Sequence, residues 1–453
     1  MRPDIHRRIA SPRASRRGAL LAIPLSLVLG WTCAAAAQEA APRSVTLDEA
    51  LAIAMDHNRD VQKAAEYQKW VRGKYVEERS AALPQFTITG SQMRQHDESQ
   101  RGLYGDFAEL FPVQQDIRSG EVGMTQALYT WGQVGAAIRA AKVGMKSAEE
   151  GLRLSRQAAR RDVTAAFYDV LLAKDLAAIA RDTLAQKERH YEEAVKKQEL
   201  GTATDYDVLA ARVAVENARP AVIRSESAVK TARQNLAFVL ADPSGELDAD
   251  GALEARPEEL PSYASALETA KANRPDLKDL ALRTEVRREL VKIAAAGDKP
   301  RLDFRAAYGT RKFLVGDLDS HGRTWNAGVY LSFPVFDGLR TRGRVIQARS
   351  DLTTAQIEEA KASDAAALEV RTAVDAVRAN ASVVSALSGT VDQAARLLEM
   401  AEKGYEYGVK TKLDVDDAQL NLAAAKGNLA TAVRDTLVAR TNLAFATGTL
   451  GEE

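Results

Sequence analysis

The sequence contains one cysteine among its 453 residues, Cys33, which lies in an N-terminal segment that we expect to be removed. The mature chain would then have no thiol, which excludes disulfides, thiolate metal sites and cysteine catalysis. The 62 basic residues balance the 62 acidic ones, so the basic excess of a nucleic-acid-binding protein is missing. Beyond residue 37 no stretch approaches about 18 consecutive apolar residues, so only strands offer a way into a membrane.

Motifs that carry chemistry are also missing. His57, His96, His190 and His321 have no partner at a metal-ligand spacing, and the six methionines do not cluster. We expect these histidines to be exposed or to cap helices. No Ser/His/Asp arrangement, phosphate-binding loop or metal motif stands out. The sequence therefore predicts no catalytic residue, no metal site and no cofactor, so the protein is not expected to be an enzyme.

The first 37 residues are typical of a secretory signal peptide. Six arginines between Arg2 and Arg17 precede the apolar run ALLAIPLSLVLGW, and the small residues Ala34 to Ala37 follow it. A membrane anchor is the alternative, but this run is too short to cross roughly 30 Å of hydrocarbon comfortably. We place cleavage near Ala37 and expect the mature chain to be exported.

The mature chain repeats one plan twice. The segment TLDEALAIAMDHNRD resembles YASALETAKANRPD, LGTATDYDVLAARVAV resembles YGVKTKLDVDDAQLNL, and NLAFVLA resembles NLAFATG. The matching segments follow in the same order, at an offset of 216 residues early and 207 late. We therefore expect a signal peptide over residues 1–37, a first repeat over 38–258 and a second repeat over 259–453.

Each repeat predicts the same elements. A helix of about 35 residues leads to a strand hairpin, at about 84–130 in the first repeat and 300–336 in the second. Long helices follow over 135–199 and 342–406, then a glycine turn and another helix of about 35 residues. Each long helix would span on the order of 95 Å, which requires an extended coiled-coil bundle. Pro220 should kink or break the helix after Gly201.

The strands alternate between apolar and polar residues. The pattern is strongest from Leu302 to Tyr308 and from Trp325 to Phe333, and it is typical of a barrel wall that is apolar outside and polar inside. A small soluble sheet half-covered by helices would give the same pattern. Four strands cannot close a barrel with a lumen, so export and two hairpins favour a barrel shared between subunits. Tyr129, Trp131 and Trp325 suit an interfacial aromatic girdle, with a core position as the alternative.

In this order the segments resemble the TolC family of outer-membrane efflux channels. The resemblance covers residues 44–450 and rests on the TLDEALAIA opening, the NRD and RPD turns, the proline strand entries, PVFDGLR, the two glycine turns and the NLAF repeat. It implies an α+β membrane protein and a homotrimer. Each protomer would give four strands to a 12-stranded outer-membrane β-barrel, which a long periplasmic α-helical coiled-coil barrel continues.

The resemblance also implies a function. The protein would be a passive exit duct of a tripartite efflux or type I secretion system, carrying small molecules or proteins across the periplasm and outer membrane. Its partners would be two further copies of itself, a periplasmic adaptor (membrane fusion protein), an inner-membrane RND or ABC pump and outer-membrane lipid, with no nucleic acid. A periplasmic coiled-coil structural or adaptor protein without a transmembrane barrel is the alternative.

The stretch YEYGVKTKLDVDDAQ matches the family motif that closes the tunnel. By resemblance, Asp414 and Asp417 ring the narrowest point, and Tyr405 and Lys410 link to Asp207 in the closed state. The tip turns would lie at Gly201 and Gly408. Because Lys410 stands where arginine is common, its link would lack the bidentate fork of arginine and be weaker.

The residues themselves leave two roles open for these aspartates. Asp414 and Asp417 share a helix face, whereas Asp416 points elsewhere and is expected to pair with Lys412. Thr204 to Asp207 and Thr411 to Asp414 also resemble capping boxes, and for Asp207 capping and linking can coexist. In a trimer, two carboxylates per chain become six around one axis, a field that attracts cations and repels anions.

Overall fold

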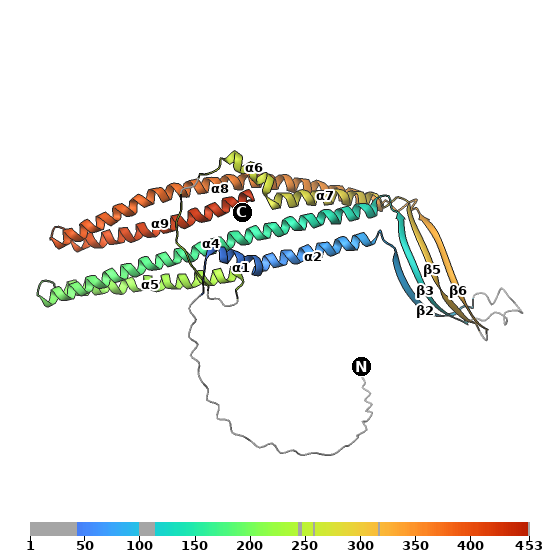
Figure 1. The fold of residues 1–453 in the computed structure, drawn as a ribbon, viewed down its shortest axis with the longest axis horizontal. Coiled ribbons are helices and arrows are strands. Elements are labelled where there is room, and N and C mark those ends of the chain that lie inside the picture. Colours follow the sequence, from blue (N-terminus) through green and yellow to red (C-terminus); the bar gives the residue numbers. More distant parts are fainter. Residues whose placement is uncertain (1–42, 99–113, 243–246, 257–258, 316–317, 452–453) are drawn as a thin grey trace, which may run out of the picture. The chain divides into compact units, whose positions relative to one another are not determined.

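The computed structural model describes residues 43–98, 114–242, 247–256, 259–315 and 318–451. The predicted signal peptide, its cleavage site and Cys33 lie outside the described residues. The chain divides into residues 1–41 and 42–453, and the second unit holds all the elements described below (Figure 1). None of the helices in the described part combines the length and the hydropathy that crossing a membrane requires.

The helix that opens each repeat is two helices rather than one. The first half contains α1 (Leu47–His57) and α2 (Arg59–Ser80), and the second contains α6 (Tyr263–Asn273) and α7 (Pro275–Ala295). The predicted single helix of about 35 residues is therefore wrong. Asn58 leaves the helical conformation and caps α2, accepting from the amides of Asp60 at 2.9 Å and Val61 at 3.2 Å. Arg274 is also extended because a residue before proline is disfavoured in the α region.

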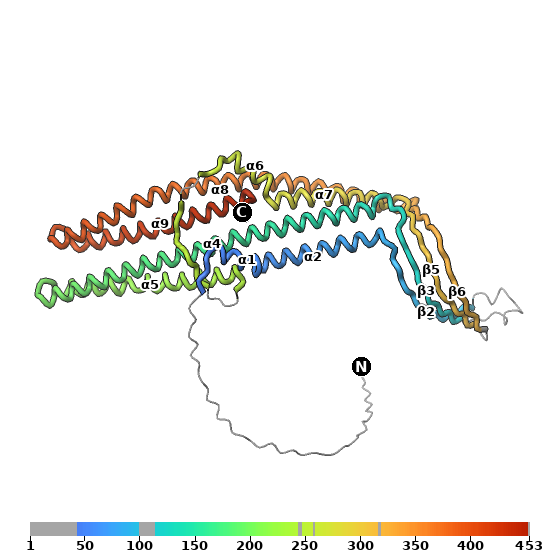
Figure 2. The backbone as a smooth tube through the Cα atoms, in the orientation of Figure 1, coloured from blue at the N-terminus to red at the C-terminus, as the bar shows by residue number. Residues whose placement is uncertain are grey.

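The sheet has four antiparallel strands in the order β2–β3–β5–β6, as Figure 2 shows. Their bounds are Gln85–His96 for β2, Gln114–Tyr129 for β3, Arg301–Val315 for β5 and Leu318–Ser332 for β6. A separate parallel pair joins β1 (Arg43–Val45) to β4 (Leu247–Ala249). Within one protomer β2 and β6 each have one neighbour, so both edges of the sheet are open to pairing with another copy.

The two faces of the sheet differ as the alternation predicted. One row across the four strands consists of Ile88, Val122, Tyr308 and Trp325, and all four side chains are exposed apolar groups. We call their side of the sheet the outer face. The next row, Thr87–Gly123–Ala307–Asn326, belongs to the opposite face and is small or polar.

The predicted girdle residues lie at the surface. Tyr129, Trp131 and Trp325 are 53%, 49% and 76% exposed, and the rings of Tyr129 and Trp131 meet edge to face at 5.3 Å. A core position for them is therefore excluded within the protomer. An aromatic ring with a polar edge suits the boundary between hydrocarbon and water, and Tyr129, opposite Leu302 at the helix end of β5, has such a position together with the adjacent Trp131. Trp325 lies instead in the middle of β6, opposite Tyr308, so its place in the sheet does not fit the predicted girdle.

Two helical hairpins form the long part of the second unit. The helices α4 (Gln133–Glu199) and α8 (Arg340–Glu406) have 67 residues each, and α5 (Asp205–Leu240) and α9 (Lys412–Thr447) have 36 each. At about 1.5 Å per residue, α4 and α8 each extend roughly 100 Å. Contacts join α4 to α5 and α8 to α9, and they set α2, α4, α7 and α8 side by side (Figure 1). The helices lie in the same order as the strands they adjoin in sequence: α2 with β2, α4 with β3, α7 with β5 and α8 with β6. Each helix therefore continues from its own strand.

The predicted break at Pro220 is wrong, because α5 runs through it from Asp205 to Leu240. Proline removes one backbone hydrogen bond from a helix interior. The rest of α5 is stabilised by packing along α4, including the ion pair of Arg181 with Glu226 at 2.8 Å. That packing holds the helix on both sides of the missing bond.

The core of the first half lies where β1, β4, α1, α4 and α5 meet. Phe167, Leu236 and Leu247 are at most 2% exposed there. Asp248 of β4 joins this core to the helices. Its carboxylate accepts from Lys174 at 3.0 Å and from Arg233 at 2.9 and 2.8 Å. Burial alone would raise the pKa of Asp248, but the hydrogen bonds from Arg233 and Lys174 outweigh it and hold the pKa below its usual value.

Replacing Asp248 by alanine should destabilise this junction by about 3 kcal/mol, because the substitution leaves two partly buried cations without a counter-charge. Urea unfolding of the detergent-solubilised protein, followed by helical circular dichroism, measures the effect. Asp250→Ala, two residues along the chain, is the control and should change little. An unchanged midpoint for Asp248→Ala would show that the ion pairs contribute nothing to the junction.

Candidate functional site

The candidate site lies at the two turns that end the helical hairpins. Gly201 and Gly408 adopt φ values of +73° and +72°, a left-handed conformation that side chains rarely adopt. In each turn a backbone amide reaches back to the end of the long helix: Thr202 to the carbonyl of Lys197 and Val409 to that of Gly404, both at 2.8 Å. Glycine at this position is the usual end of an α-helix. The two turns therefore have the same backbone conformation and the same closing hydrogen bond.

A capping box begins the helix after each turn. In α5 the Asp207 carboxylate accepts from the amide of Thr204 at 2.9 Å, and in α9 Asp414 accepts from the amide of Thr411 at 2.8 Å. Each threonine hydroxyl also donates to its aspartate at 2.7 Å. The hydrogen bonds to Thr204 lower the pKa of Asp207, and those to Thr411 lower the pKa of Asp414. Both carboxylates are therefore held in the charged form at the helix start.

Lys410 lies against Asp414 rather than Asp207 within the protomer. Its Nζ is 3.4 Å from Asp414 Oδ1, and both side chains are partly exposed. The stem of Lys410 lies over Gly404, where an added Cβ would come within 2.6 Å of Lys410 Cγ. Asp207 is on the other hairpin and is occupied by its own cap. The predicted link from Lys410 to Asp207 thus stays a prediction for the assembled trimer.

Asp417 stands apart from these contacts. It is exposed one turn beyond Asp414, on the same side of α9 as Leu413 and Leu420, which are 67% and 69% exposed. Among the described residues no side-chain hydrogen bond or ion pair to Asp417 is formed. The Asp414 carboxylate accepts hydrogen bonds from Thr411 and forms an ion pair with Lys410. The Asp417 carboxylate instead faces solvent. Of the two candidate aperture carboxylates, Asp414 is therefore engaged and Asp417 is not.

Three contacts near the turns join the two hairpins. Lys187 of α4 forms an ion pair with Asp416 of α9 at 3.3 Å, and Lys197 Nζ lies 5.0 Å from the ring centre of Tyr405. The third contact, between His190 and Gln419, has a separation of 2.8 Å. The predicted pairing of Asp416 with Lys412 is wrong. A lysine placed before its acid is the weaker order for a helical pair, and an ion pair to the neighbouring hairpin replaces it.

His190 is a partly buried interface residue rather than the exposed or capping histidine that was predicted. The His190 Nε2 atom forms a hydrogen bond with the side-chain amide nitrogen Nε2 of Gln419. The amide oxygen of Gln419, Oε1, is buried and has no hydrogen-bond partner in the described structure. Burial lowers the pKa of His190, and the nearby Lys412 lowers it further. Glu193 of α4 and Asp416 of α9 act in the opposite direction. Sequence spacing offered no signal, since the partners are 229 residues apart.

Acid should loosen this interface. Because folding lowers the pKa of His190, the neutral form stabilises the folded contact fully above the ordinary value near 6.5, and that stability is lost as the pH falls below it. We expect amide hydrogen exchange at the start of α9, corrected for intrinsic rates, to rise several-fold between pH 7.5 and pH 5. His190→Gln should remove this pH dependence, whereas His57→Gln in α1 should leave it intact. Equal acid responses in all three proteins would exclude His190 as the cause.

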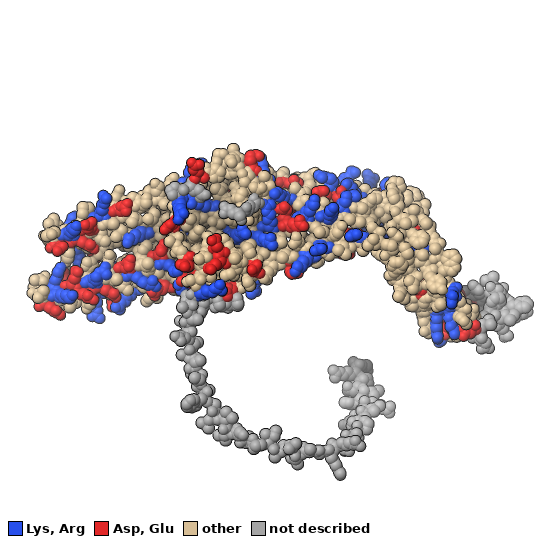
Figure 3. All heavy atoms as spheres, viewed as in Figure 1, with Lys and Arg blue, Asp and Glu red and all other residues tan. Residues whose placement is uncertain are grey.

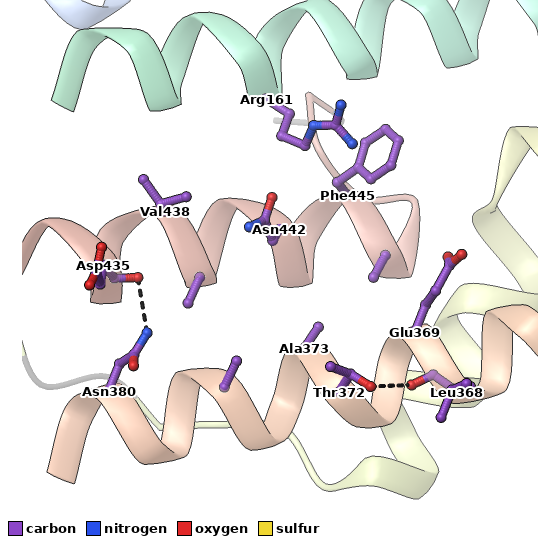
Figure 4. Close-up of a pocket in the computed structure, with 13 residues that line it drawn as sticks. Arg161, Leu368, Glu369, Thr372, Ala373, Asn380, Asp435, Val438, Asn442 and Phe445 are labelled. Atoms are coloured by element: carbon purple, nitrogen blue, oxygen red, sulfur yellow. Dashed lines mark hydrogen bonds between the residues drawn. The ribbon is translucent and has the colours of Figure 1, made fainter. Parts of the chain in front are cut away.

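Two observations concern the described residues away from the tips. Within them, no three His, Cys, Asp or Glu side chains gather in a way that could hold a metal ion. A groove of about 640 Å³ lies between α8 and α9, where the Arg161 guanidinium of α4 is 4.5 Å from the ring centre of Phe445 (Figure 4). The 13 lining residues include Glu369, Thr372 and Asp435 and no histidine, cysteine or lysine.

Comparison with known proteins identifies the class. A family model described as "Outer membrane efflux protein" matches residues 50–242 and 266–449. The outer membrane protein OprJ of Pseudomonas aeruginosa is 26% identical over 380 residues, covering 81% of this chain and 76% of OprJ. The alkaline protease secretion protein AprF of the same species is 25% identical over 410 residues, covering 88% of this chain and 84% of AprF. The Campylobacter jejuni CmeC outer membrane channel has a TM-score of 0.79 at 17% identity, covering 89% of this chain and 85% of CmeC.

The structural likeness settles the fold class as that of an α+β outer-membrane channel protomer. Three copies with four strands each form one 12-stranded barrel, which the helices continue as a periplasmic coiled-coil barrel. Within the protomer, β2 and β6 are the two open edges of the sheet. The matched segments span most of both repeats, and the chain belongs to the outer membrane efflux protein family.

Proposed function

We propose that the hairpin tips form the closable end of an outer-membrane exit duct, with Asp414 and Asp417 as its aperture carboxylates. The protein lies in the outer membrane and extends into the periplasm, and its family serves as the exit duct of tripartite export systems. The family consists of efflux channels, and the tip would act through its charge. The observation that carries the proposal is the exposed carboxylate of Asp417 beside the capped carboxylate of Asp414.

Trimeric symmetry multiplies this small charge. Two carboxylates in each of three copies give six around one axis, and the caps at Thr411 keep Asp414 ionised. A ring of carboxylates attracts cations and repels anions. Lys410 offsets part of the charge of Asp414, so Asp417 supplies the larger share of the field. A cation-preferring aperture is the result.

Opening would separate the α8–α9 hairpin from the α4–α5 hairpin. The contacts that must break within the protomer are Lys187 with Asp416, His190 with Gln419 and Lys197 with Tyr405. In the protomer the Tyr405 ring contacts Lys197 rather than Asp207, the partner that the resemblance implies, and we propose the contact with Lys197 as a further closed-state link. The proposed links of Lys410 and Asp207 would act in addition, across the boundary between copies. Gly201 and Gly408 allow both hairpins to turn sharply at the tip.

Exposed apolar side chains at the tips support docking of a periplasmic adaptor. Leu200 and Tyr407 are each 78% exposed, and they occupy equivalent positions in the two turns. Tyr206 at 78% and Leu413 at 67% form a second equivalent pair. Large apolar groups exposed at the same positions in both repeats indicate a binding surface rather than scattered exposure. Three copies would present six similar tips to one ring of adaptor.

Photo-crosslinking in the native host tests this docking. A photoreactive residue at position 407 should crosslink a periplasmic membrane fusion protein, identified by mass spectrometry, because Tyr407 belongs to the exposed tip. The same residue at position 346, near the sheet end of α8, should not. Crosslinks from position 346 alone would place the adaptor elsewhere. The co-purified pump would distinguish an RND pump, which implies small molecules, from an ABC pump, which allows protein cargo.

A further inference from the structure

The outer face of the sheet changes from apolar to basic towards the end that lies farthest from the helices. The rows containing Tyr308 and Ala306 are apolar. Two positions farther along the strands the row is Gly90–Gly120–Thr310–Arg323, and two positions beyond that it is Gln92–Arg118–Lys312–His321. Figure 3 shows Lys and Arg, with some Asp and Glu beside them, gathered at this end, next to a stretch of the sheet that has few charges. We call Arg118, Lys312, His321 and Arg323 the basic band.

Basic residues of the band lie directly opposite one another on neighbouring strands. Arg118 of β3 lies directly opposite Lys312 of β5, which lies directly opposite His321 of β6. Opposite side chains in an antiparallel pair have Cβ atoms roughly 5 Å apart, and like charges in that arrangement destabilise the sheet. An anion seated between them would remove that repulsion. The row Arg118–Lys312–His321 would therefore be stabilised by a bound anion.

The carboxylates of this region offset only part of the positive charge of the band. Asp116 binds Arg94 through both of its oxygens, at 2.6 and 2.7 Å, and Asp319 pairs with Lys312 at 2.7 Å. Arg94, Arg118, Lys312 and Arg323 against Asp116 and Asp319 give 4 − 2 = +2 per protomer on this face. Arg118 and Arg323 are exposed, and no carboxylate among the described residues forms an ion pair with either.

The height of the band fits the boundary of a membrane. Lys312 lies ten positions beyond Leu302 along β5, and Leu302 pairs with the exposed Leu331 at the other end of the apolar rows. Ten residues extend roughly 33 Å along a strand, and a barrel tilt of about 40° turns this into a rise of about 25 Å. The apolar band of outer-membrane barrels is about 25 Å tall. The basic band therefore lies at the level of the headgroups in the outer leaflet.

We propose that the basic band binds the phosphate groups of a phosphorylated lipid headgroup in the outer leaflet. Arginine binds phosphate in a bidentate manner and lysine adds a point charge, and the row supplies both side by side. A lipid is favoured over free phosphate because the same face continues into apolar rows that would contact its acyl chains. The open edge strand β6 carries His321 and Arg323, so the band reaches the boundary with the next copy. This proposal is independent of the aperture and docking proposals.

Lipid binding to the purified mature trimer in neutral detergent tests the proposal. The probes are deep-rough lipopolysaccharide, the same lipid after enzymatic removal of its phosphates, and inorganic phosphate. We expect native mass spectrometry to show retention of the phosphorylated lipid and a higher temperature of trimer dissociation. Arg118→Gln/Lys312→Gln should weaken this binding at least tenfold, and added salt should weaken it in the wild type.

The matched control is Arg311→Gln, which removes a cation from the neighbouring position on the opposite face of β5. It should bind the lipid as the wild type does. Equal binding by the double variant, or equal binding of the dephosphorylated lipid, would overturn the proposal. The same rise in dissociation temperature with inorganic phosphate alone would reassign the band to free anions. Circular dichroism and trimer recovery confirm that each variant is folded.

Discussion

Replacing Asp414 and Asp417 together by asparagine is expected to remove most of the cation preference of the channel. The substitution takes six carboxylates from one axis while leaving side chains of nearly the same size. A focused ring of charge raises local cation concentration by about tenfold or more, so the cation-to-anion permeability ratio should fall by a comparable factor. Reversal potentials in planar bilayers under a salt gradient measure the ratio, and block by multivalent cations should weaken in parallel.

The single variants sharpen this prediction. Asp417→Asn should lower the permeability ratio more than Asp414→Asn, because Lys410 already offsets part of the charge of Asp414. Asp414→Asn should also reduce the helical stability of α9, since it alters the capping box with Thr411. The matched control for selectivity is Asp416→Asn, whose carboxylate is directed to Lys187 in the hairpin interface. It should leave the permeability ratio unchanged even where loss of this contact alters how readily the channel opens. Selectivity unchanged in the double variant would remove both carboxylates from the aperture.

Joining the two hairpins covalently is expected to abolish transport. The mature chain has no native cysteine beyond the predicted signal peptide, so cysteines introduced at Lys187 and Asp416 would be the only thiols. These side chains lie 3.3 Å apart in the protomer, and a short cleavable bismaleimide-type linker could span them. If opening requires the hairpins to separate, the linked protein should conduct and export at background level. Cleavage of the linker should restore both activities.

A linker within one hairpin provides the control. Arg181 and Glu226 form an ion pair at 2.8 Å between α4 and α5, which are expected to move together. Cysteines at these positions, joined by the same linker, should leave conductance and export unchanged. Full activity of the protein linked between positions 187 and 416 would show that opening does not separate α4 from α9. Loss of activity in both linked proteins would instead indicate a general effect of crosslinking.

The long helices were predictable because their signal is local. An unbroken stretch without proline, ended by glycine, predicted helices over 135–199 and 342–406, and both observed helices begin two residues earlier. The face alternation of the strands was predictable for the same reason, since period-2 patterning places apolar residues on one side. The breaks at Asn58 and Arg274 were also signalled locally, by a capping amide and by the proline that follows. They were missed because the apolar pattern continues across them.

The contacts between the two hairpins could not be predicted from the sequence. The partners of Lys187 and His190 are each 229 residues away, and their pairing depends on how α4 packs against α9. A short-range pair of Asp416 with Lys412 was therefore predicted instead. The capping role of Asp414 was visible in the sequence, but its contact with Lys410 was not. Local geometry thus identified the charged tip, whereas tertiary packing determines which charges hold the hairpins together.

The location of the aperture is tested most directly by the sidedness of block in single-channel recordings of the wild-type trimer. A multivalent cation is added first to the side that faces the hairpin tips and then, in a separate experiment, to the side that faces the sheet. The account predicts cation-selective conductance, strong block from the tip side and much weaker block from the other side, because the carboxylate ring lies at the tip. Anion preference, or equal block from both sides, would contradict it.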